Sequence, residues 1–192
     1  MYTFKPIVFM KPSHLSTKRI TLRRSQNSDV EILFHNYFSA SCCSKFLTRQ
    51  PHLHVNQTQN FLNSWCDNAW DYDLGKFGWV IASAESDEPI GVFLVMLEEH
   101  KAQIHFGISK NFWRQGLVTE AGNAVIQWLM NQPDLQRIWA VCDLLNQGSS
   151  KVLEKLNFQK EGILHNWVIL PAFGGSARDC YMYALTYERY WS

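Results

Sequence analysis

The sequence predicts one mixed α/β domain, in which an antiparallel sheet is followed by strands joined through crossover helices. Three observations predict it. Residues 77–109 hold three apolar or β-branched runs separated by short polar turns, helical periodicity flanks these runs, and strand and helix patterns alternate afterwards. The 192 residues, 46% of them hydrophobic, suffice for one core and are too few for two domains. Three successive strands exclude the purely alternating doubly wound folds.

The first predicted elements are a strand and two helices. Residues 20–23 alternate apolar and polar side chains and predict a half-buried strand. Ser28 precedes Glu31 by three residues, the spacing of a capping box, so a helix is expected to begin there. A second helix follows a turn at residues 56–58. The apolar faces of these helices hold Val30, Leu33, Phe34 and Tyr37 in the first, and Phe61, Leu62, Trp65 and Ala69 in the second.

The later elements begin with the three central runs. Because their connections are short, these runs predict an antiparallel meander of strands at 77–84, 90–97 and 102–109. A helix then begins near residue 117 and ends before Pro133. The last four elements are a strand at 137–142, a helix at 148–156, and strands at 158–164 and 179–186.

Composition limits the partners and the compartment. The 18 Lys and Arg nearly balance the 17 Asp and Glu, which argues against a nucleic-acid partner. The apolar patch at residues 7–10 is too short for a secretory signal, and no run reaches the roughly 18–20 apolar residues of a membrane helix. We therefore expect a cytoplasmic protein with no membrane partner, as a monomer or homodimer, with an extension at residues 1–14 and one domain at 15–192.

The cysteines predict neither a disulfide framework nor a metal site. Their number, five, is odd, and none of them forms a Cys-x-x-Cys motif. We expect reduced thiols and no bound metal.

One segment carries the chemical signal. A buried strand ends near Ser109, a short polar loop follows, and a helix begins at Gly116 or Leu117. The first N–H groups of a helix lack partners and attract anions, a glycine lets the backbone approach closely, and Arg114 adds a cation. The pattern predicts a phosphate site, although an ordinary turn has the same pattern.

Two sequence blocks decide between these interpretations. Residues 113–121 (Trp-Arg-Gln-Gly-Leu-Val-Thr-Glu-Ala) resemble the acetyl-CoA pyrophosphate loop of the GNAT superfamily of N-acetyltransferases, especially its RimJ/RimL-like branch. Residues 146–158 resemble the Asn-x-x-Ser-x-x-Val-Leu-Glu-Lys-x-Gly-Phe block of that branch. Residues 15–23 resemble its opening strand, and Asp29 resembles the acidic residue that follows this strand. The resemblance spans residues 15–187. It implies the GNAT-like acyl-CoA N-acyltransferase fold, a central, mostly antiparallel sheet flanked by about four helices.

The resemblance implies an acetyl-CoA site in this chain. Backbone N–H groups of the loop would hold the pyrophosphate, the strand ending at Ile108 would pair with the pantetheine arm, Asn146 would hydrogen-bond that arm, and Lys151 would approach the nucleotide. The loop residues concerned are Arg114, Gln115, Gly116, Leu117, Val118 and Thr119. Val118 departs from the usual glycine or alanine and threatens to crowd the pyrophosphate. Asn146 has a second interpretation, as a plain helix N-cap.

The catalytic residues follow from the same comparison. Ser149 occupies the position of a serine in the ribosomal-protein branch and would protonate the departing thiolate, although first-turn serines are common on helix surfaces. A family glutamate aligns with Gln103, which cannot accept a proton. His105 lies two residues further on the same side of the strand, and its imidazole suits the role of base. A structural histidine, with a water as base, is the alternative.

We therefore expect an enzyme, an N-acetyltransferase that transfers acetyl from acetyl-CoA to a primary amine by direct attack in a ternary complex. The acceptor would be a protein N-terminus, or alternatively a small molecule such as a polyamine, an amino sugar or an antibiotic. Its pocket is expected between the two early helices and the loop at residues 166–175, among the aromatic residues Trp65, Trp70, Tyr72, Trp167 and Phe173. The rival hypothesis is a non-catalytic acyl-CoA-binding module.

Overall fold

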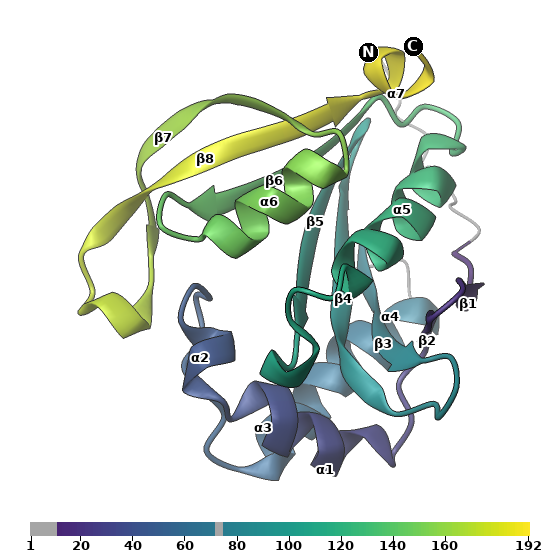
Figure 1. The fold of residues 1–192 in the computed structure, drawn as a ribbon, viewed down its shortest axis with the longest axis vertical. Helices are drawn as coiled ribbons and strands as arrows, with labels where there is room; N and C mark the ends of the chain where they lie inside the picture. The colour runs from purple at the N-terminus through teal and green to yellow at the C-terminus, as the bar shows by residue number, and fades with distance from the viewer. Residues whose placement is uncertain (1–10, 72–74) are drawn as a thin grey trace, which may run out of the picture.

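A single mixed sheet forms the centre of the protein. The computed structural model describes residues 11–71 and 75–192 (Figure 1). Their eight strands lie in the order β1-β2-β3-β4-β5-β6-β8-β7, which confirms the predicted mixed α/β class. The strands are β1 (His14–Ser16), β2 (Ile20–Arg23), β3 (Lys76–Ser83), β4 (Pro89–Glu98), β5 (Lys101–Ile108), β6 (Arg137–Asp143), β7 (Gln159–Ile169) and β8 (Ala177–Thr186).

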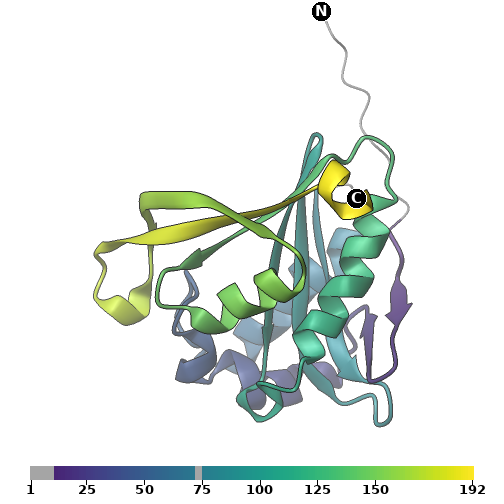
Figure 2. The same cartoon turned by 45° about the horizontal axis from the view of Figure 1, so that its top comes forward.

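The sheet is antiparallel except at one junction. Strands β1 to β5 each pair antiparallel with the next, so the predicted meander is confirmed. β6 joins this block through a parallel pairing with β5, and β8 then lies between β6 and β7. In Figure 2 the β7–β8 hairpin projects away from the part of the sheet that α5 covers.

Helices cover both faces of the sheet. α1, α3 and α4 pack against β3 and β4, whereas α5 crosses the opposite face with α6 beside it (Figure 1). The helices are α1 (Asp29–Leu33), α2 (Ser41–Ser44), α3 (Val55–Leu62), α4 (Asn68–Asp71), α5 (Leu117–Met130), α6 (Gln147–Lys155) and α7 (Tyr187–Trp191). π-helical turns at Phe34–Phe38 and Asn63–Asp67 continue the two predicted early helices. Within residues 11–71 and 75–192, no helix is both long and apolar enough to cross a bilayer.

Alternation along β3 separates two cores. Trp79 and Ile81 belong to the larger cluster, which includes the buried face of α5. Val80 points the other way and packs with Leu33 and Leu62 of the early helices. The period of two residues in a strand is what lets this one strand supply both cores.

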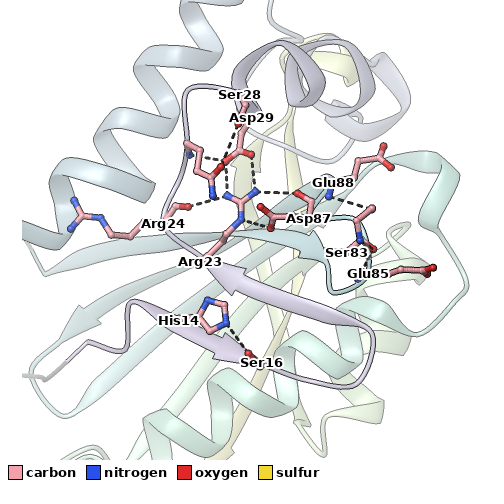
Figure 3. Close-up of polar contacts among 12 residues, drawn as sticks. His14, Ser16, Arg23, Arg24, Ser28, Asp29, Ser83, Glu85, Asp87 and Glu88 are labelled. Carbon is pink, nitrogen blue, oxygen red and sulfur yellow. Dashed lines mark hydrogen bonds and ion pairs between the residues drawn. The ribbon is translucent and has the colours of Figure 1, made fainter.

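A buried arginine ties α1 to the sheet (Figure 3). Arg23 donates to both carboxylate oxygens of Asp29, at 2.8 and 2.9 Å, and to Asp87 at 2.7 Å. The capping box predicted at Ser28 and Glu31 is wrong, because the Ser28 hydroxyl bonds the side chain of Gln26. Asp29 instead accepts the Gln26 N–H and carries the negative charge that Arg23 requires.

Other differences from the prediction lie at element ends. The second early helix begins at Val55, before the expected turn, and Gln57 accepts the N–H of His54 just ahead of it. β1, α2 and α7 are short elements that the sequence pattern did not predict. Of the extension expected at residues 1–14, the structure describes only 11–14, so that boundary stays a prediction.

Candidate active site

The junction between β5 and β6 opens into a cavity. The two strands pair only at residues 101–103 of β5 and 137–139 of β6, and they diverge beyond these rungs. The divergence lies toward the end of β5 that leads into the predicted phosphate loop. A cavity of about 150 Å³ fills the gap. Its lining comes from both faces of the sheet and consists of residues 46–48, 104–106 and 140–143 with Asn146, Ser149, Val168, Leu170 and Cys180.

The loop after β5 has the geometry of an anion site. Arg114 and Gly116 have positive φ values of 62° and 77°. Gly116 directly precedes the 14-residue helix α5. The Gly116 carbonyl is the first acceptor of the helix and accepts the Glu120 N–H at 3.0 Å. The N–H groups before Glu120, in the first turn of α5, therefore lack acceptors within the helix and point out of its N-terminal end.

Val118 does not obstruct this loop. Its side chain is 8% exposed and packs in the larger core. The crowding expected from this departure is absent because the first turn of α5 directs Val118 toward the sheet, while Gln115 and Gly116 are exposed.

Asn146 caps α6 and lines the cavity as well. Its side-chain oxygen accepts the Ser149 N–H at 3.2 Å, so the N-cap interpretation is confirmed. Ser149 lines the same cavity next to Cys142. Burial raises the pKa of the Cys142 thiol, and hydrogen bonds from Ser150 and Ser149 partly offset that rise.

His105 lines the cavity from β5. Its Nε2 is buried and lacks a hydrogen-bond partner among the described residues. Burial lowers its pKa, so the imidazole is neutral at physiological pH. Gln103, by contrast, lies on the last rung between β5 and β6, opposite Trp139, and is outside the cavity lining.

Ile108 and Lys151, like the predicted loop residues 114–119, lie outside the cavity lining. Ile108 ends β5, and its carbonyl accepts the indole N–H of Trp113 at 2.9 Å, which fixes the strand end to the loop. Lys151 is exposed on α6. Their contacts with the cofactor stay predictions.

The expected aromatic pocket is located differently. Trp70 donates to the Gly78 carbonyl and packs at the β3 side, and Trp65 stacks on Phe61. Neither lines the cavity. Trp167 is 51% exposed, and Tyr72 lies outside the described residues. Phe173 does approach, since its ring lies 5.6 Å from that of Phe46, a cavity residue.

The sequence did not reveal a buried ion pair at the end of β6. Asp143 has a side chain only 1% exposed, lines the cavity, and accepts Arg178 Nη2 at 3.0 Å and the Leu145 N–H at 2.9 Å. Burial alone would raise the pKa of Asp143, but these hydrogen bonds outweigh it and lower the pKa. A carboxylate ending an apolar strand was the available signal, whereas its partner, 35 residues away, gave none.

Comparisons with known proteins decide the family. A family model described as an acetyltransferase (GNAT) domain matches residues 19–159. The chain belongs to the GNAT acetyltransferases. Uncharacterized N-acetyltransferase p20 of Bacillus licheniformis is 28% identical to this GNAT chain over 179 residues, covering 92% of the chain and 97% of the relative.

Solved GNAT structures share the fold. The microcin C7 self-immunity acetyltransferase MccE, in complex with acetyl-CoA and AMP, superimposes with a TM-score of 0.80 at 20% identity, covering 92% of this chain and 98% of its own. RimL, a ribosomal L7/L12 α-N-protein acetyltransferase in complex with coenzyme A, gives a TM-score of 0.78 at 20% identity, covering 90% and 97%. The chain is thus an N-acetyltransferase, and GNAT enzymes use acetyl-CoA as cosubstrate.

The residues present fit this cosubstrate. Past residue 103, every second residue of β5 directs its backbone N–H and C=O toward a gap rather than a strand. Such an edge suits the amide groups of a pantetheine arm, and the N-terminus of α5 at the same end of the strand suits a diphosphate. The sequence and the structure therefore point to one site.

Proposed function

We propose that this GNAT enzyme acetylates a primary amine by direct attack in a ternary complex within the β5–β6 cavity. The observation that carries the proposal is the position of His105 and Ser149 in the lining of one cavity, next to the strand that leads into the phosphate loop. A base and an acid near one reaction centre are what amine acetylation requires.

The phosphate loop anchors the cosubstrate. Backbone N–H groups of residues 114–119 hold the pyrophosphate, aided by the partial positive charge at the N-terminus of α5. The β5 edge near Ile108 and the side chain of Asn146 hold the pantetheine arm, and Lys151 lies toward the nucleotide. These assignments combine the family resemblance with the exposed loop and the cavity position of Asn146.

Two side chains move the protons. His105 Nε2, neutral because its pKa is lowered by burial, accepts the proton that the amine nitrogen loses as it forms the bond to the acetyl carbonyl carbon. Ser149 gives its hydroxyl proton to the sulfur as the carbon–sulfur bond breaks. These transfers leave His105 protonated and the Ser149 oxygen deprotonated, and passage of the His105 proton to Ser149 through solvent restores both groups.

The charge of the cavity favours a monoamine over a polyamine. Its lining holds one carboxylate, that of Asp143, and Arg178 neutralises it. At about 150 Å³ the cavity is smaller than the 300–1,000 Å³ typical of small-molecule pockets, so only the amine-bearing end of an acceptor enters. We therefore propose a protein N-terminus as acceptor, as for RimL, which is a ribosomal L7/L12 α-N-protein acetyltransferase. A small-molecule amine such as an amino sugar or an antibiotic is the second candidate, since MccE, a microcin C7 self-immunity acetyltransferase, shares the fold.

A thiol-release assay tests the proposal. The purified protein is incubated with acetyl-CoA and equimolar acceptors, namely peptides with free N-termini, the same peptides blocked by formylation, spermidine and glucosamine, and products are identified by mass spectrometry. We expect acetylation of free peptides only, and a pH–rate profile whose acid limb disappears in His105→Gln. Acetylation of glucosamine alone would select the second candidate. Binding of acetyl-CoA without transfer to any amine would replace the proposal with the acyl-CoA-binding module.

A further inference from the structure

The turn between β1 and β2 is hydrogen-bonded to the first turn of α5, which lies about a hundred residues later in the chain. Glu120 accepts the Thr17 hydroxyl at 2.6 Å, the Arg19 N–H at 2.9 Å and Arg19 Nε at 2.7 Å. Arg19 Nη1 continues to the Gln115 carbonyl at 3.0 Å. One turn, at residues 17–19, thus contacts both the phosphate loop and the helix that follows it.

The bond to Gln115 fixes a peptide plane of the phosphate loop. In a trans peptide the carbonyl of one residue and the N–H of the next point in opposite directions. Holding the Gln115 carbonyl toward Arg19 therefore directs the Gly116 N–H away from Arg19. Gly116 has a positive φ of 77°, a conformation that a free loop visits only in part. The arginine selects the orientation in which this N–H is presented.

The ion pair also removes a charge conflict. Glu120 lies in the first turn of α5, where it favours the helix but would repel an anion at the helix end. Arg19 Nη2 lies 2.7 Å from its carboxylate and neutralises it. Arg19 remains 48% exposed, and a Cβ built on Gly116 would lie 3.7 Å from its Nη2. The guanidinium therefore lies beside Gly116 as well as on the Gln115 carbonyl.

We propose that Arg19 and Glu120, with Thr17, are positioning residues for acetyl-CoA. They orient the Gly116 N–H toward the diphosphate and keep the first turn of α5 free of net negative charge. The inference rests on the proposed assignment of residues 114–119 as the phosphate loop. It adds to that loop a part of the molecule outside both sequence blocks that carry the family's cofactor motif.

The alternative is an ordinary surface ion pair that only links the hairpin to the helix. Arg24 offers a matched control, since it bonds Asp67 at 2.7 Å and Asp71 at 3.0 Å on the side of the early helices. Loss of such an ion pair would have the same effect as loss of the Arg24 pairs: it would change stability and leave the affinity for acetyl-CoA unchanged. A positioning device predicts a dependence of affinity on the charge of Glu120.

Calorimetric titration with acetyl-CoA separates the two. Arg19→Ala should weaken binding about ten- to hundredfold, because it frees the Gln115 carbonyl and leaves the Glu120 carboxylate unpaired. Adding Glu120→Gln to Arg19→Ala should restore part of the affinity, since the repulsion disappears. Arg19→Lys should be intermediate, and Arg24→Ala should bind as wild type does. The melting temperature of each variant without ligand records the structural component.

Each outcome decides a separate point. An unchanged affinity in Arg19→Ala, or a double variant that binds no better than Arg19→Ala, overturns the positioning role. Gly116→Asp, measured alongside, tests the loop itself. If Gly116→Asp abolishes binding while Arg19→Ala does not, only the positioning role fails. If Gly116→Asp binds normally, the phosphate-loop assignment fails with it.

Discussion

Each half of the sheet contains a buried arginine–aspartate ion pair, but the surroundings of the two pairs differ. In the closed half, β1 to β5, the central strand β4 pairs along most of its length with both β3 and β5, and the Arg23–Asp29 ion pair is enclosed among strands and early helices. In the open half, β6 to β8, only three rungs reach β5, and the Arg178–Asp143 pair faces a cavity. Both acids have side chains 1% exposed. The degree of burial therefore does not tell a structural ion pair from one at a site, whereas the pairing of the adjacent backbone does.

The largest expected effect lies in the closed half. Arg23→Ala removes the cation that satisfies Asp29 and should destabilise the fold by about 3–5 kcal/mol, since it leaves a carboxylate buried and unpaired. Urea denaturation measures the loss. Arg24→Ala breaks exposed pairs and should cost at most about 1 kcal/mol. Equal losses in the two variants would contradict the contrast between enclosed and exposed pairs.

The next effect lies in the open half and concerns rate rather than stability. Ser149→Ala removes the proposed proton donor and should lower kcat about 10²-fold, while the melting temperature stays close to that of the wild type. Stopped assays with the peptide acceptor at saturating acetyl-CoA measure it. Ser150→Ala, one residue on and bonded to Cys142 at 3.4 Å, is the matched control and should retain most activity. A wild-type kcat in Ser149→Ala would exclude Ser149 as the proton donor.

A smaller effect is expected where α5 packs against the end of α6. In Gly122→Ala the new methyl on α5 would lie 2.6 Å from Leu156 Cδ1, a buried contact at the end of α6. Overpacking costs about 1–3 kcal/mol and the gain in helix propensity returns about 1 kcal/mol, so we expect a net loss of about 1 kcal/mol in denaturation. Gly162→Ala on the edge strand β7, with nothing within 4 Å of its added methyl, should be nearly neutral. A gain in stability in Gly122→Ala would mean that Leu156 and the end of α6 shift readily to make room for the methyl group.

The smallest effect is a pH dependence of stability in the closed half. His52 stacks on Phe38, and burial together with the charge of Arg49 lowers its pKa from 6.5 to about 4. Because the folded state holds the neutral form, its stabilisation is complete above pH 6.5 and is lost as the pH falls from 6.5 toward 4. The melting temperature should therefore fall by a few degrees over that window. His52→Gln should remove part of this fall, and a profile identical to that of the wild type would exclude His52 as its source.

The sequence predicts local features and misses pairings between distant segments. The central strands follow from their apolar runs, and α5 and α6 follow from their periodicity and motif residues. The burial of Val118 was not predicted, because the motif fixes a position in the loop but not the direction of its side chain. The Arg178–Asp143 and Arg19–Glu120 pairs depend on strand order and on a hairpin placed beside a distant helix. No local pattern encodes either, and Ser28 illustrates the converse, a local capping pattern replaced by a tertiary ion pair.

The three parallel rungs between β5 and β6 have a consequence for hydrogen exchange. In the ligand-free protein, the amides of β5 that face β4 are held in strand pairing along residues 101–108, whereas those facing β6 lose strand partners beyond residue 103. One strand should therefore show alternating slow and fast deuterium uptake over its last five residues. Acetyl-CoA seated on that edge would slow the fast set alone, giving a residue-level signature of occupancy that needs no acceptor.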